Sequence, residues 1–185
     1  MSILSRKVSR LLTVALVTSI ALLPPVLRSV TRKPPNTQVA AQLDAARSEA
    51  YELARDAEEM TSLLNNDVSW QSHATVLNRI RDHVNNMGKI LEKLQSERDE
   101  ASPWQQEAID RMVPLLKDIA ANTTAAIEHL NQNQIRPVSE DYKEYLQQNA
   151  DTAHALADMI SSFVKYDRTR ATLEALQDKI EMPHN

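Results

Sequence analysis

The sequence predicts an all-α protein, namely an antiparallel up-down-up-down bundle of four helices preceded by an N-terminal signal or membrane-anchor segment. Two features of composition favour helices. The 185 residues include one glycine, Gly88, and only 4% are aromatic, whereas sheets need glycine at turns and aromatic or β-branched residues along strands. The third observation is hydrophobic spacing, which repeats at steps of three and four through four stretches of nearly equal length. This is the period of one helix face.

The four stretches cover about residues 38–65, 70–97, 103–131 and 140–167, and each carries one mainly apolar stripe. A sustained seven-residue repeat favours left-handed packing at a shallow angle. Equal helices joined by short turns pack most simply as an up-down-up-down bundle. We expect the stripes to form the core, including Leu53, Ile80, Leu116 and Leu156. The stripe residues are Val39, Leu43, Ala46, Ala50, Leu53, Ala57, Met60 and Leu64; Trp70, His73, Leu77, Ile80, Val84, Met87, Leu91 and Leu94; Ile109, Met112, Leu116, Ile119, Thr123, Ala126 and Leu130; and Tyr142, Leu146, Asn149, Ala153, Leu156, Ile160 and Phe163.

The breaks between the stripes carry helix-end signals. Ser102-Pro103-Trp104-Gln105 has the form of a capping box, in which the serine caps the helix, proline takes its first position and the glutamine completes the box. Polar stretches at 65–69 and 131–139 provide the other two turns. Inside the third helix, Pro114 removes one backbone hydrogen bond, so we expect a kink near Asp110.

The apolar spacing changes after Phe163, and a new stripe of Leu173, Leu176 and Ile180 follows. We interpret residues 168–185 as a C-terminal helical tail. It is either a continuation of the fourth helix past the end of the bundle or a short fifth helix. The bundle itself is assigned to residues 37–167.

Residues 1–36 are interpreted as a targeting segment. A basic stretch precedes an uncharged, mainly apolar run over residues 11–23, and two prolines follow, which is the layout of a secretory signal. The alternative is an uncleaved anchor over residues 11–27, a length at the short limit for a membrane span. The small-residue motif at 19–21 would cut inside the apolar run, so both readings stay open. The proline-rich stretch 31–36 is expected to be an extended linker.

Charge and cysteine content exclude several classes of function. Residues 1–35 hold six of the 21 basic residues and none of the 25 acidic ones, so the rest of the chain carries a net charge of about −10. Such a body repels nucleic acids, which are bound through Lys and Arg, and we expect no nucleic-acid partner. The chain has no cysteine, which excludes disulfides, thiolate catalysis and cysteine zinc sites.

Two stretches, SWQSHATVLNRIRDHVNNMGK (69–89) and SPWQQEAIDRMVPLLKDIAANTTAAIEHLN (102–131), resemble segments of an uncharacterised family of bacterial envelope proteins. Members of that family also begin with an apolar leader. The resemblance covers the two central helices. It implies an exported helical bundle, and it implies no activity and no site residue.

Two weak patterns could hold a metal or a haem. Carboxylate-bridged metal bundles use pairs of Glu-x-x-His motifs, and the nearest match is one Asp151-x-x-His154. We expect that pair to be exposed on the flank of the bundle. His73 and His129 should lie at nearly the same height, where two imidazoles could serve as axial haem ligands. The alternative, which we favour, is a pair of hydrogen-bonded structural histidines.

Three other sets of residues have an expected place in the bundle. Met87, Met112 and Met159 are expected in one layer, either as flexible core filler or as thioether ligands for Cu(I). The helix-initial Trp70 and Trp104 are expected to plug opposite ends of the bundle. Thr123 and Asn149, which interrupt apolar stripes, should form one layer and share a hydrogen bond or a bridging water.

Two classes of function remain. The first is a non-catalytic envelope bundle that serves as a scaffold, adaptor or interaction module. It would lie in the periplasm or be anchored to the inner membrane and face the periplasm. The alternative is a periplasmic ligand-, haem- or metal-binding bundle. The sequence assigns no catalytic, cofactor-binding or metal-binding residue and predicts no cofactor. Expected partners are the membrane through residues 11–27 of an uncleaved leader, another protein, or further copies of this chain.

Overall fold

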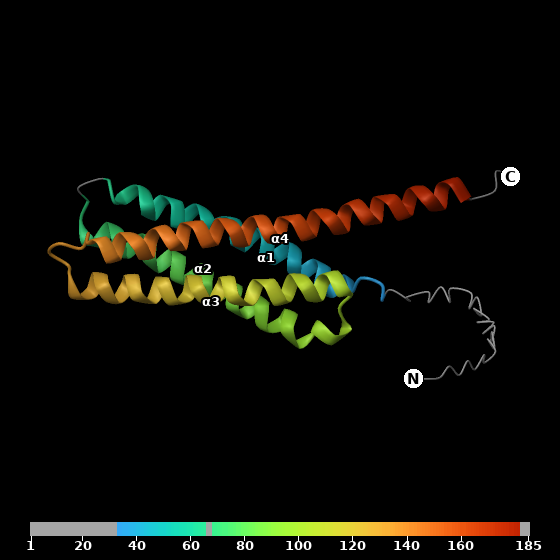
Figure 1. Cartoon of the computed structure of the whole chain (residues 1–185), viewed down its shortest axis with the longest axis horizontal. Coiled ribbons are helices and arrows are strands. Elements are labelled where there is room, and N and C mark those ends of the chain that lie inside the picture. Colours follow the sequence, from blue (N-terminus) through green and yellow to red (C-terminus); the bar gives the residue numbers. More distant parts are fainter. Residues whose placement is uncertain (1–32, 66–67, 182–185) are drawn as a thin grey trace, which may run out of the picture. The chain divides into compact units, whose positions relative to one another are not determined.

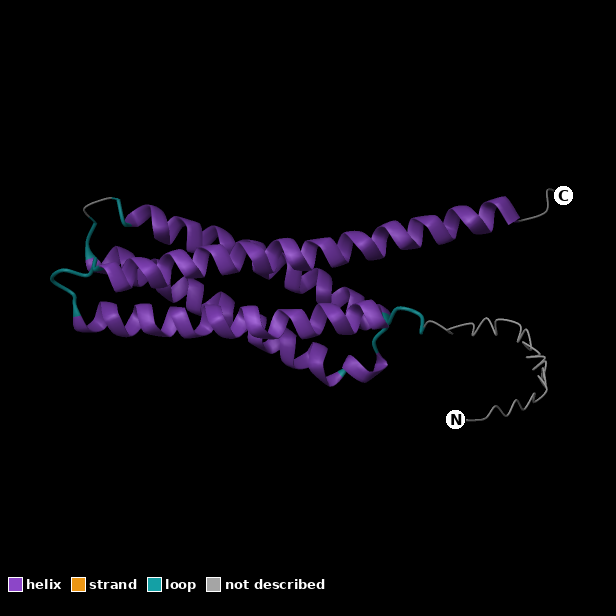
Figure 2. Ribbon diagram, in the orientation of Figure 1, coloured by secondary structure: helices purple, strands orange, loops and turns teal. Residues whose placement is uncertain are grey.

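The computed structural model describes residues 33–65 and 68–181, which belong to one compact unit. This described part is all-helical, and it contains four long helices and no strand (Figure 2). The helices are α1 (Thr37–Leu63), α2 (Trp70–Ser96), α3 (Pro103–Gln132) and α4 (Glu140–Glu181). A short 3-10 turn, η1 (Arg98–Glu100), connects α2 to α3. The all-α prediction is confirmed for these residues, and the first three predicted helices agree with the structure to within two residues at each end.

The four helices pack in a ring. α1 lies against α2 and α4, and α3 lies against the same two helices. Successive helices run in opposite directions, and the C-terminal turns of α4 continue past the ends of the other helices (Figure 1). The described residues therefore form the helical bundle that the equal segment lengths predicted.

The predicted stripes form the core. Leu53, Ile80 and Leu156 are fully buried and Leu116 is 6% exposed. Every other stripe residue is also buried, apart from four that are half-buried and pack against the core: Leu64, Trp70, Val84 and Phe163. Leu64 and Trp70 lie at helix ends. The periodicity therefore identified the correct face on all four helices.

The capping box joins two helix starts. Oε1 of Gln105 accepts hydrogen bonds from the backbone N–H of Ser102 (2.9 Å) and from the backbone N–H of Asn36 (2.9 Å). The Gln105 amide donates to the Asn36 carbonyl (2.8 Å). The Asn36 side chain caps α1 by accepting from the backbone N–H groups of Gln38 and Val39. One buried glutamine thus ties the start of α3 to the start of α1.

The tail continues the fourth helix. α4 runs unbroken for 42 residues to Glu181, so the alternative of a short fifth helix is wrong and the predicted boundary at residue 168 is not a helix boundary. α3 likewise runs unbroken through Pro114, whose side chain is exposed. The kink near Asp110 stays a prediction.

Residues 1–32 of the predicted targeting segment and linker (1–36), including the possible span at 11–27, lie outside the described residues. Among the residues that the structure describes, no helix combines the length and the apolar character needed to cross a membrane.

Candidate functional site

Two histidines and a tyrosine meet at the end of the bundle where α2 and α4 begin. His73 and Tyr142 are buried, and a hydrogen bond of 3.2 Å joins Nδ1 of His73 to the Tyr142 hydroxyl. The ring centroids of His73 and Tyr142 lie 5.7 Å apart, and those of His129 and Tyr142 lie 5.2 Å apart in a stacked arrangement. His73 and His129, expected at one height, therefore contact the same aromatic ring.

The polar atoms of this cluster fasten the α3–α4 loop. Nε2 of His129 lies 3.0 Å from the carbonyl oxygen of Pro137 and 3.2 Å from the hydroxyl of Ser139. Ser139 in turn caps α4, because its Oγ accepts from the Tyr142 N–H at 3.2 Å. Burial lowers the pKa of His73 and raises the pKa of Tyr142. The environment of this pair thus favours the uncharged form of both side chains.

This geometry bears on the haem hypothesis. The Tyr142 ring contacts both imidazoles, and Nδ1 of His73 and Nε2 of His129 already have hydrogen-bond partners. Tyr142 is fully buried, and its loss from that position would expose a cavity in the core. The arrangement supports the structural reading of both histidines.

The other sequence candidates are dispersed. Asp151 and His154 are exposed, as expected, and the Asp151 carboxylate accepts a hydrogen bond from Gln147 at 3.0 Å. Met87, Met112 and Met159 are buried on three different helices. Their burial agrees with the core-filling reading, and binding of Cu(I) stays a prediction.

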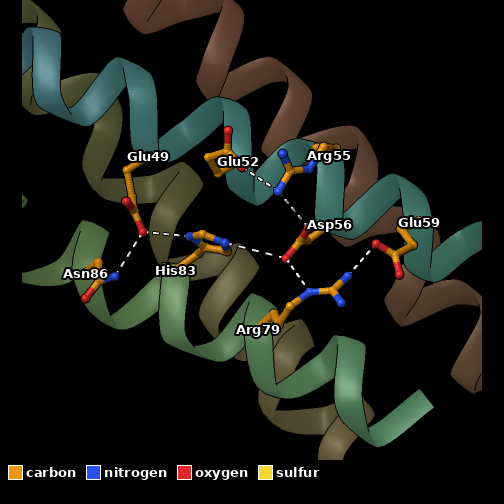
Figure 3. A network of polar contacts seen from close by, with 8 residues as sticks. All are labelled: Glu49, Glu52, Arg55, Asp56, Glu59, Arg79, His83 and Asn86. Carbon is orange, nitrogen blue, oxygen red and sulfur yellow. Dashed lines mark hydrogen bonds and ion pairs between the residues drawn. The ribbon is translucent and has the colours of Figure 1, made fainter. Parts of the chain in front are cut away.

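A network of charged side chains joins α1 to α2 (Figure 3), and the sequence reasoning missed it. At its centre is Asp56, whose side chain is only 2% exposed. Its Oδ2 lies 2.9 Å from Nε of Arg79 and 3.5 Å from Nε2 of His83, and its Oδ1 lies 3.4 Å from Nη2 of Arg55. Arg79 also pairs with Glu59. Both carboxylate oxygens of this buried acid are therefore matched by cationic or imidazole nitrogens.

His83 links Asp56 to a second carboxylate. Its Nδ1 lies 2.7 Å from Oε1 of Glu49, which also accepts a hydrogen bond from Asn86 at 3.1 Å. The imidazole therefore bridges two carboxylates of α1 through its two nitrogens (Figure 3). Because α1 contributes the acids while α2 contributes Arg79, His83 and Asn86, the network fixes the axial register of the two helices.

A sequence signal for this network existed. Glu49, Glu52, Asp56 and Glu59 follow one another at steps of three and four, so they form an acidic stripe along α1. On α2 Arg79, His83 and Asn86 follow the same spacing. Two matched polar stripes on neighbouring helices predict contact between them. The stripe alone does not predict the burial of Asp56, because a single acid beside the seam is usually exposed.

An aromatic groove lies between α3 and α4 at the opposite end of the bundle. The ring centroid of Trp104 lies 6.4 Å from that of Phe163 and 5.8 Å from that of Tyr166. The guanidinium carbon of Arg111 lies 5.6 Å from the Phe163 ring centroid, which is a cation–π contact. Met159 and Ser162 complete the lining of a hollow of about 480 Å³ that is open to solvent. Trp104 and Trp70 are both half-buried and start helices at opposite ends, as predicted.

The groove continues onto an exposed stripe of α4. From the groove to the end of the helix, residues at alternating steps of three and four share one face. We call this face the outer stripe, and its members are Met159, Ser162, Tyr166, Thr169, Leu173, Leu176 and Ile180. Leu173, Leu176 and Ile180 are 57%, 49% and 82% exposed. Large exposed aliphatic side chains in regular array on one helix face are characteristic of an interaction surface.

Comparisons with family models, with curated proteins and with solved structures found no match to this chain.

Proposed function

We propose that this chain is a non-catalytic helical-bundle protein of the bacterial envelope that serves as an interaction module. The observation that carries the proposal is the outer stripe. A second apolar seam on α4 has the spacing of a helix–helix interface, yet along Leu173, Leu176 and Ile180 it faces solvent. The bundle then acts as a rigid base, and the α4 arm, defined as residues 165–181, carries the binding surface.

The arm is suited to binding because its helix is already nucleated. An isolated helix of this length is marginal in water, since forming the first turn is costly. Here the arm extends a helix that the bundle stabilises through ten buried residues of α4. A partner therefore meets a preformed apolar face, and little conformational entropy is lost when it binds.

The envelope location rests on the leader and on the resemblance of the two central helices to envelope proteins. The basic and then apolar order of residues 1–23 supports export. We propose that the bundle is periplasmic or is anchored through residues 11–27 with the bundle facing the periplasm. Cell fractionation with and without alkaline extraction distinguishes a released protein from an anchored one.

The interaction surface is tested by two matched double variants of the full chain. Leu173→Asp with Leu176→Asp places two charges on the outer stripe. Ala171→Asp with Ala175→Asp places the same two charges on the opposite, exposed face of the arm. After chemical cross-linking in intact cells, which retains a contact that would dissociate on dilution, the extracted wild-type chain is expected in a complex larger than one chain. The first variant is expected to shift to single-chain size, and the second is expected to retain the complex.

Circular dichroism shows that each variant is folded before its size is compared. Equal behaviour of the two variants, or a wild-type chain that is already single, contradicts the proposal. A visible absorption spectrum with a haem band, or stoichiometric metal in protein purified from its native host, would instead support a cofactor-binding bundle.

A further inference from the structure

We infer that the occupant of the outer stripe is a second copy of this chain, bound through its own α4 arm in antiparallel orientation. This inference rests on the proposed function and names the partner of the same surface. It stands on three observations: the seam spacing, the distribution of charge along the arm, and the aromatic groove at the base of the stripe.

The charges of the arm favour an antiparallel copy of itself. Residues 165–170 contain three basic residues and one acid, whereas residues 174–181 contain three acids and one basic residue. The base therefore has a net charge of +2 and the tip a net charge of −2, although within one chain Arg168 also pairs with Asp44 and Arg170 with Glu174. In an antiparallel pair, each positive base lies beside the negative tip of the other copy, and unlike charges attract. A parallel pair would place base beside base and tip beside tip.

Flanking residues select the register. In an antiparallel pair the a position of one helix packs against the d position of the other, and like flanking positions face each other. Pairing Leu173 with Leu176 of the second copy places Thr169 against Ile180 and leaves Arg170 facing Gln177. A shift by one heptad would bring Arg170 against the second copy's Arg170. A parallel pair would bring Lys165 against Arg170. Only the first register avoids a repulsive contact among these residues.

The groove accommodates the tip of the second arm. In this register Ile180 of one copy reaches the level of Thr169 in the other, one helical turn from Tyr166 and the groove lined by Trp104 and Phe163. The negative end of the incoming helix dipole then points towards Arg111, a cation beside that groove. The apolar groove is complementary to the apolar side chain of Ile180, and the cation Arg111 is complementary to the acidic C-terminal end of the arm.

The size of the contact predicts a reversible dimer. The arm of 17 residues spans about 25 Å, and one such helix pair buries less than the roughly 1,600 Å² of a standard interface. The dimer is therefore expected to dissociate on dilution and to exchange its subunits. An exchangeable contact between two bundles suits a module that links envelope components.

Cysteine cross-linking of the full chain in intact cells tests the pairing. The sequence contains no cysteine, so the introduced cysteines are the only thiols of the chain. The double variant Thr169→Cys with Ile180→Cys is expected to give a covalent dimer, because residue 169 of each copy faces residue 180 of the other. Within one chain the two positions are about 16 Å apart along the helix, so a short linker cannot join them. Ile180→Cys alone is expected to give no dimer.

Each outcome decides the inference. A covalent dimer from Ile180→Cys alone would indicate a parallel pair and overturn the antiparallel arrangement. Two outcomes would overturn self-pairing and leave the proposed function standing. The first is adducts only with other proteins. The second is no adduct, while the wild-type chain still migrates in a complex that Leu173→Asp with Leu176→Asp disrupts. If Leu173→Asp with Leu176→Asp leaves the complex intact, both self-pairing and the proposed function are overturned. Ala171→Cys, on the opposite face, serves as the control for random collision.

Discussion

The side-chain amide of Asn149 on α4 donates a 3.0 Å hydrogen bond to the hydroxyl of Thr123 on α3, and both side chains are buried. This confirms the predicted polar layer between adjacent helices. Oδ1 of Asn149 is buried and has no hydrogen-bond partner among the described residues. The Asn149 amide therefore has a partner for its nitrogen and none for its oxygen. A buried polar group of this kind fixes the pairing of helices more than it stabilises them.

Replacing Asn149 with leucine should keep or raise the melting temperature. The change removes an unpaired buried carbonyl, whose desolvation is unfavourable, and adds apolar contacts. The change also removes the buried hydrogen bond that fixes how α3 and α4 pair, so we expect extra oligomers or broadened NMR resonances. Thr123→Val is the contrasting variant. It leaves the whole Asn149 amide without its partner and should cost about 1–3 kcal/mol of unfolding free energy. Equal effects of the two changes would contradict this account.

The central seam residues should be the most sensitive to truncation. Leu53→Ala, Ile80→Ala or Leu156→Ala should each reduce the free energy of unfolding by about 2–5 kcal/mol, because each leaves a cavity among fully buried neighbours. Urea denaturation measures the loss. Leu173→Ala is the matched control, since that side chain is 57% exposed on the arm. A similar loss at Leu173 would mean that the arm is part of the cooperative core.

The charged network predicts an asymmetric mutational response. Arg79→Ala removes the closest cationic partner of the buried Asp56 and should cost about 1–3 kcal/mol, the penalty of a poorly paired buried group. Asp56→Leu with Arg79→Met removes both charges and should recover most of that loss. Arg98→Ala breaks an exposed pair with Asp110 and is expected to cost much less. A double variant as unstable as Arg79→Ala would show that desolvation of Asp56 is not the cause.

Stability should fall as the pH is lowered below about 6.5, and His73 should cause part of the fall. Burial lowers the pKa of His73 below its ordinary value of 6.5. Below pH 6.5 the unfolded state therefore binds a proton more readily than the folded state, and unfolding is favoured. The stability that uncharged His73 contributes is fully present above pH 6.5. It is lost as the pH falls from 6.5 through the lower pKa that His73 has in the folded state. In His73→Gln the slope in this window should be shallower than in the wild-type chain. Unfolding curves at pH 7.5 and 5.5 measure the slopes.

The fold could be predicted from the sequence because one seam dominates each helix. Steps of three and four located the core face on all four helices, and the capping box at Ser102 and Gln105 located the start of α3. The spacing shift after Phe163 did not decide between a continuous and a broken helix. A change of apolar face leaves the backbone free to continue, and α4 contains no glycine or proline that would stop it.

The polar contacts were harder to predict. The Asp56 network depends on how α1 and α2 are rotated about their axes, which moves a flanking acid between solvent and interface. The Tyr142 ring contacts both His73 and His129. This arrangement depends on the α3–α4 loop, and the sequence of that loop has no hydrophobic period from which its path could be predicted. The apolar residues of the outer stripe were visible in the sequence, but their exposure follows only from the length of α4 beyond its neighbours (Figure 1).

The central claim is that the outer stripe of α4 is a binding surface, and a photo-cross-linking scan of the full chain in cells tests it most directly. A photoreactive residue is placed in turn at each position of the arm, 165–181, and the yield of protein adduct is measured. The account predicts a yield that rises and falls with the helix period. Its maxima should fall at Tyr166, Thr169, Leu173, Leu176 and Ile180, and its minima at Ala171, Ala175 and Asp178. An even yield along the arm, an absence of adducts, or maxima on the Ala171 face would contradict it.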